Sequence, residues 1–196
     1  MKKKLLVVLA LLAAAVAGVL VSGAMQPEKY HVERSVMIAA PPDVVYAALS
    51  DFRRFPEWSP WEKMDPGMTR TMSSPSSGVG ASYAWKGEKV GEGRMTIVSA
   101  KPNELVDIKL EFLKPWESTA GVKWTVKPEG ALTKVTWGMD GNNNGLMAKT
   151  FSMFMNMDKM IGKDFESGLA ALKVLSEKDA KNPPATPRAA EAPTPK

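Results

Sequence analysis

Apolar and polar residues alternate along six segments between residues 30 and 140, which is the period of strands with one buried face. The clearest segment places Val106, Ile108, Leu110 and Phe112 on one face, opposite the charged residues between them. Turn-forming runs such as Lys101-Pro102-Asn103 separate the segments. The pattern predicts one antiparallel sheet that is apolar on one side, hence an α+β fold once helices are added.

Helical spacing appears at both ends of this strand region. A short helix is predicted after Pro41-Pro42, because proline is tolerated in a first helical turn. The aromatic stretch from Asp51 to Trp61 contains two prolines and has room for at most one more turn, and residues 65–80 read as a surface loop. A single long helix is predicted from about Leu146 to about Leu175, with one broad apolar stripe that covers the sheet. The stripe consists of Phe151, Phe154, Met155, Ile161, Phe165, Leu169 and Leu172.

The N-terminus has the layout of a membrane-targeting segment. Three lysines at positions 2–4 precede an unbroken apolar run from Leu5 to Val21. With its small flanking residues the run is long enough to cross a bilayer, so we favour an uncleaved anchor over residues 1–24. A cleaved signal peptide that ends at Ser22-Gly23-Ala24 is the alternative. In both cases the lysines stay in the cytoplasm and the domain lies outside it, in the periplasm of a bacterium.

The remaining chain divides into three parts. We expect a juxtamembrane linker over residues 25–29, one globular domain over residues 30–178, and a disordered tail over residues 179–196. The tail is rich in proline, alanine and charge and has no apolar periodicity.

Charge and cysteine content exclude several function classes. The formal charge is +5, but without the three N-terminal lysines 23 basic residues face 21 acidic ones, a balance of +2 with no basic cluster. Nucleic-acid binding needs such a cluster and is therefore not expected. The absence of cysteine excludes disulfides, thiolate zinc sites and cysteine nucleophiles.

Candidate catalytic groups are few. His31 is the only histidine and lies on the polar side of its predicted strand, so we expect its side chain to be exposed to solvent and not catalytic. Because the chain offers no second imidazole and no thiolate, we expect no metal site. Glu57 and Glu62 flank the tryptophans and would serve as acids or bases only if burial raised their pKa; solvation is the simpler reading. Arg94 is expected to pair with Glu92 or with a carboxylate on a neighbouring strand.

The order of elements and one local block together resemble the START-like superfamily, also called the SRPBCC or Bet v 1-like group. The block runs from Asp51-Phe52 through Phe55-Pro56-Glu57-Trp58-Ser59-Pro60-Trp61, and Ala40-Pro41-Pro42 with Val45-Tyr46 and Gly78-Val79-Gly80 support it. The similarity is greatest to the polyketide cyclase/dehydrase and lipid-transport branch and covers about residues 30–177. It implies a helix-grip fold, in which a curved antiparallel sheet wraps a long C-terminal helix around a cavity. Members hold lipids, sterols, polyketides or quinones, and some are enzymes.

Aromatic and methionine side chains suggest such a cavity, because methionine fills irregular space and tryptophan offers an amphipathic wall. The residues expected to line it are Trp58, Trp61, Tyr83, Trp85, Phe112, Trp124, Trp137, Phe154 and Met155. We therefore expect a membrane-tethered protein that binds a lipid-, quinone- or polyketide-like molecule without a cofactor. A cyclase or dehydratase that uses Glu57, Glu62 or Tyr83 remains an alternative, as does a protein-interaction module at the membrane surface whose partner is unknown.

Overall fold

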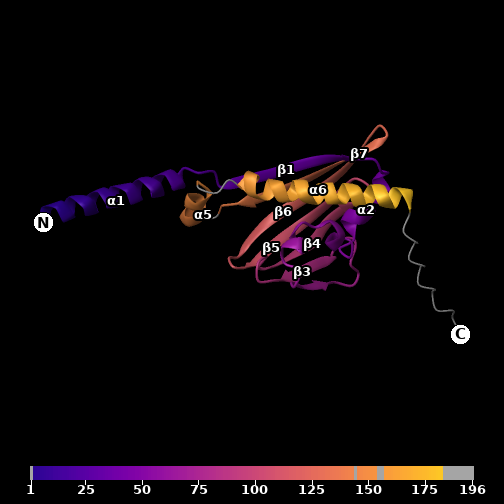
Figure 1. The fold of residues 1–196 in the computed structure, drawn as a ribbon, viewed down its shortest axis with the longest axis horizontal. Helices are drawn as coiled ribbons and strands as arrows, with labels where there is room; N and C mark the ends of the chain where they lie inside the picture. Colours follow the sequence, from indigo (N-terminus) through magenta and orange to yellow (C-terminus); the bar gives the residue numbers. More distant parts are fainter. Residues whose placement is uncertain (1, 144, 154–156, 183–196) are drawn as a thin grey trace.

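In the computed structural model, which describes residues 2–143, 145–153 and 157–182, a seven-stranded antiparallel sheet forms the centre of the domain (Figure 1). The strand order is β1-β7-β6-β5-β4-β3-β2, so chain neighbours pair by hairpins, and only β1 joins out of sequence, at the edge beside β7. The elements are α1 (Lys2–Ala24), β1 (Lys29–Ile38), α2 (Pro42–Ser50), α3 (Phe55–Trp58), α4 (Trp61–Met64), β2 (Thr69–Met72), β3 (Ser82–Lys86), β4 (Glu92–Lys101), β5 (Leu105–Lys114), β6 (Ser118–Glu129), β7 (Leu132–Asn142), α5 (Gly145–Ser152) and α6 (Met157–Lys181).

The predicted strands and their buried faces are confirmed. On β5 the residues Val106, Ile108 and Leu110 are buried, and on β4 Ile97 is buried whereas its neighbour Val98 is exposed. This alternation follows from the pleat, which turns successive side chains to opposite faces. The sheet with helices on one side is the predicted helix-grip arrangement.

Four details differ from the sequence prediction. The predicted loop over residues 65–80 contains an edge strand, β2, which pairs with β3. The aromatic stretch holds two single-turn helices, α3 and α4, because each proline lies at a position where a turn begins. The single helix predicted from Leu146 is instead two helices, since α5 ends at Ser152 and α6 begins at Met157. The expected domain end at residue 178 falls inside α6, which continues to Lys181.

Helix α6 packs mainly against β1, at one edge of the sheet, and not across its middle. Arg34 of β1 holds it by donating to Asp158 and Glu166 at 2.8 and 2.7 Å. Gly162 makes room for this guanidinium, because a Cβ there would lie 2.1 Å from an Arg34 nitrogen. Gly168 does the same for Trp137, whose ring would lie 2.9 Å from an added Cβ. The two glycines therefore fix a close approach of α6 to the β1–β7 edge.

The core joins the sheet to α2, α3 and α6 through a chain of aromatic contacts. Phe165 of α6 stacks on Trp137 of β7 with ring centroids 4.2 Å apart. Trp137 meets Trp58 of α3 edge to face at 5.5 Å, and Trp58 also donates to the carbonyl of Ala48 in α2. These contacts tie three helices to the centre of the sheet.

Helix α1 projects away from the domain, and α5 lies beside its C-terminal end (Figure 1). Its stretch Leu6–Ala24 has a mean hydropathy of 2.6 and is almost entirely exposed, so by length and composition it is able to cross a membrane. Of the predicted tail, residues 183–196 lie outside the described part of the chain.

Truncation of Leu172 tests the packing of α6. Leu172 is completely buried, so Leu172→Ala should lower the free energy of unfolding by about 2–5 kcal/mol. Val174, two residues along the helix, is 69 % exposed, and Val174→Ala should change stability by less than about 0.5 kcal/mol. Urea unfolding of both variants measures the difference, and equal losses would show that α6 does not pack as described.

A candidate ligand cavity

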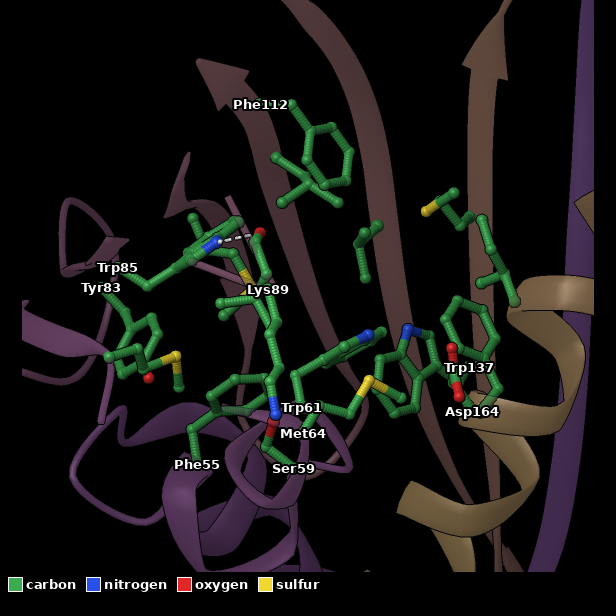
Figure 2. A pocket seen from close by; sticks show the side chains of 18 residues that line it. Phe55, Ser59, Trp61, Met64, Tyr83, Trp85, Lys89, Phe112, Trp137 and Asp164 are labelled. Carbon is green, nitrogen blue, oxygen red and sulfur yellow. Dashed lines mark hydrogen bonds between the residues drawn. The ribbon is translucent and has the colours of Figure 1, made fainter. Parts of the chain in front are cut away.

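A cavity of about 350 Å³ lies between the sheet, α6 and the single turns α3 and α4 (Figure 2). Its volume falls at the lower end of the range for pockets that enclose small molecules, about 300–1,000 Å³. Strands β3 to β7 supply one wall, and the N-terminal half of α6 with α3 and α4 supplies the other. The lining is predominantly aromatic and aliphatic, including Met64, Met68, Met95 and Met139.

The cavity exists because α6 covers only one edge of the sheet. The apolar face of β3, β4 and β5 extends beyond the reach of α6. Helix α2 packs on β5 and β6, and the short turns α3 and α4 reach β3, where Phe55 and Glu62 contact Tyr83. One-turn helices present few side chains, so these turns leave space between themselves and the sheet. The hollow is therefore a consequence of the element lengths.

Five of the expected lining residues lie on the cavity wall: Trp61, Tyr83, Trp85, Phe112 and Trp137. Trp61 and Trp137 stand side by side, with ring centroids 5.7 Å apart (Figure 2). Trp85 is held over the cavity by its Nε1, which donates to the carbonyl of Val90 at 3.2 Å.

Two other expected residues lie in the packed core and not on the wall. Trp58 and Trp124 are each 1 % exposed and meet edge to face at 5.3 Å. They support the wall from behind, through contacts with Phe55 and Trp137, which do line the cavity. Phe154 and Met155 lie outside the described residues.

A few polar groups on the wall lack a protein partner. The hydroxyl of Ser59 and the Nε1 of Trp137 are buried without a hydrogen bond in the described structure. Asp164 of α6 also lines the cavity, has no hydrogen-bond partner among the described residues, and has its pKa raised by burial. Buried polar groups normally find partners, so these atoms are candidates to contact a polar part of a bound molecule or ordered water.

Another polar group at the wall, the hydroxyl of Tyr83, is already engaged. It donates to Glu62 Oε1 at 2.6 Å, and Arg70 pairs with the same carboxylate. Burial raises the pKa of Tyr83, and the Glu62 carboxylate raises it further. Tyr83 therefore stays a neutral donor, and the network joins α4 to β2 and β3 as a structural tie.

The other charged candidates point away from the cavity. Glu57 pairs with Arg54, which also contacts Asp179 at the end of α6. His31 is half exposed and pairs with Asp140 across the β1–β7 pair, which raises its pKa. Arg94 pairs with Glu111 on the adjacent strand, as one of the two expected arrangements.

Within residues 2–143, 145–153 and 157–182, no three acidic or histidine side chains gather closely enough to hold a metal ion.

Sequence reasoning missed Ser59, Asp164 and Lys89 as lining residues. Asp164 is not part of the apolar stripe predicted for this helix. Its spacing carried the contrary signal, since it lies three residues after Ile161, and residues three apart are neighbours on one face of a helix. No comparable signal marked Lys89, which reaches the cavity from the turn between β3 and β4.

Residues 29–177 match the family model described as polyketide cyclase / dehydrase and lipid transport. The chain belongs to this family. The match covers the whole sheet and all but the last turn of α6. The cavity therefore lies within the domain that defines the family. No curated protein matches the chain.

Solved structures show the same fold at low sequence identity. A protein from Nitrosospira multiformis aligns with a TM-score of 0.56 and 18 % identity, over 78 % of this chain and 99 % of its own. The di-domain ARO/CYC StfQ from the steffimycin biosynthetic pathway aligns at 0.57 and 13 %, over 79 % of this chain and 52 % of its own. Ara h 8.0201 aligns at 0.52 and 10 %, over 78 % and 98 %. At these identities the likeness shows the fold alone.

The raised pKa of Asp164 predicts a pH dependence. A carboxyl whose pKa is higher in the folded than in the unfolded state stabilises the fold below the unfolded pKa and loses that contribution as pH rises through the folded value. Asp164→Asn should therefore raise the free energy of unfolding at neutral pH by a small amount, because the group is only partly buried, and leave it unchanged at low pH. Urea unfolding at acidic and neutral pH tests this, and a loss of stability at neutral pH would contradict it.

Proposed function

We propose that this protein is a membrane-anchored binding protein that encloses an apolar small molecule between its sheet and α6. The observation that supports this most directly is the aromatic and methionine wall around about 350 Å³ of space. Burial of apolar surface contributes about 25 cal/mol per Å², so a ligand that fills the cavity gains affinity without charge pairing.

The unpartnered polar groups refine the ligand class. A purely hydrocarbon ligand would leave the Ser59 hydroxyl and the Trp137 indole N–H without partners, at a cost for each buried group. A ligand that carries an oxygen atom would accept a hydrogen bond from either donor. We therefore propose an amphiphile, such as a lipid-, quinone- or polyketide-like molecule with a carbonyl or carboxyl oxygen.

Catalysis is the second candidate, and Asp164 is the observation that favours it. It is the carboxyl group on the cavity wall, and its raised pKa moves it toward use as a general acid. A cyclase or dehydratase would need such a group beside the substrate. Turnover of a candidate polyketide that is lost in Asp164→Asn, with substrate binding retained, would establish this role.

Narrowing the cavity tests ligand enclosure. Val122 lies on the cavity wall and Gly121, its neighbour on β6, has open space around it on the other face. Val122→Phe should reduce cross-linking of a photoactivatable fatty acid to the cavity peptides by about tenfold, equivalent to about 1.4 kcal/mol. Gly121→Val should leave it unchanged. The full-length protein in lipid nanodiscs is irradiated and digested, and adducts are mapped by mass spectrometry. Equal labelling of both variants would contradict enclosure in this cavity.

The anchor has its own test. If α1 stays in the bilayer, alkaline carbonate should leave the full-length protein in the membrane fraction, because only an integral segment resists extraction. The domain is then proposed to lie on the extracytoplasmic side, opposite the N-terminal lysines. Recovery of a soluble form that begins near Met25 would instead establish a cleaved signal peptide.

A further inference from the structure

We propose that the turn between β5 and β6, residues 115–117, together with α5, contacts the bilayer surface and places the cavity end of the domain against the lipid. This inference rests on the proposed anchoring by α1. It adds a second contact, made by the folded domain itself, and commits to one partner, a phospholipid surface.

The turn exposes an unusually large apolar side chain. Trp116 is 79 % exposed, and Leu113, just before the turn, is 49 % exposed. Single exposed aliphatic residues are common on soluble domains, but a tryptophan this exposed at a hairpin tip has almost no protein contact. Tryptophan is favoured at the membrane interface, where its ring lies among the headgroups and its N–H meets water.

The strand register places this turn at the level of the anchor. Tyr30 of β1 pairs with Gly141 of β7, which pairs with Ala120 of β6. Strands β1 and β6 each pair antiparallel with β7, so they run in the same direction. Trp116 precedes Ala120 by four residues, as Gln26 precedes Tyr30. Gln26 lies two residues after α1 ends at Ala24, so both chains reach the membrane end of the sheet at a similar height.

Helix α5 occupies the same level. It packs against the end of α1, where Gly23 leaves room for Thr150, because a Cβ at Gly23 would lie 2.2 Å from the threonine hydroxyl. Lys149 of α5 pairs with Glu28 at 2.9 Å, just beyond the anchor. The helix also exposes Leu146, which is 44 % exposed. A bilayer that surrounds α1 would therefore also contact α5. Figure 1 shows the β5–β6 turn at the end of the sheet that lies nearest to both helices.

The cavity extends toward this end of the domain. Phe112 lines it and pairs with Ser118, the first residue of β6 after the turn. Contact of the turn with the bilayer would therefore leave a short path between the lipid and the cavity. An apolar ligand would exchange along this path with little exposure to water.

The absence of cysteine permits a direct test with single introduced cysteines in the full-length protein. A fluorescent NBD label at Glu117→Cys reports on the turn while leaving Trp116 in place. Labels at Ala131→Cys, in the turn between β6 and β7 at the other end of the sheet, and at Val16→Cys, within α1, are the aqueous and lipid controls. The protein is reconstituted in phosphatidylethanolamine and phosphatidylglycerol vesicles.

We expect the label at position 117 to be quenched by nitroxide-bearing lipids and protected from aqueous iodide, whereas the label at position 131 shows the reverse. Trp116→Ser in the same labelled protein should shift the label at position 117 toward the behaviour of position 131. A label at position 117 that is iodide-accessible while position 16 is in lipid would overturn this contact and leave the anchor standing. If position 16 is also accessible to iodide, both the anchor and this proposal fail.

Discussion

The close approach of α6 to the β1–β7 edge is the constraint on which the rest of the structure depends. Gly162 and Gly168 allow it, because a side chain at either position would collide with Arg34 or Trp137. The Arg34 ion pairs and the Phe165–Trp137 stack then fix the helix there. Because α6 is held at one edge, the short turns α3 and α4 cover part of the apolar face of β3 to β5. The cavity is the space that remains between these turns, α6 and the sheet.

This arrangement separates structural from ligand-facing aromatic residues. Trp58 and Trp124 are buried in the core and support the wall, whereas Trp61 and Trp137 line the cavity. The polar ties follow the same division. The Glu62 carboxylate satisfies the Tyr83 hydroxyl at the wall and also binds Arg70, whereas Ser59, Trp137 and Asp164 keep polar atoms without protein partners among the described residues. The unpartnered groups, and not the satisfied ones, are therefore those available to a ligand.

The sheet was predictable from sequence because period-two alternation follows directly from the pleat, as Val106 to Phe112 illustrate. The edge strand β2 was not, since Thr69–Met72 lies on a sheet margin where burial, and hence alternation, is weak. The alternation of apolar and polar residues also could not predict which buried aromatic residues line the cavity and which lie in the packed core. Trp124 and Trp137 pair directly across β6 and β7, are equally buried, and differ only in what lies in front of them. Asp164 shows the converse: it is not part of the predicted apolar stripe, yet it lines the cavity together with Ile161 and Phe165.

Native mass spectrometry of the full-length protein, purified from its own membrane in mild detergent, tests most directly whether the cavity holds a molecule. We expect a retained adduct in the mass range of a single amphiphile, which dissociates on activation and is identified by fragmentation. Detection of the protein only at its ligand-free mass, with no uptake of lipid, quinone or polyketide added in excess, would contradict the proposal that the cavity holds a ligand.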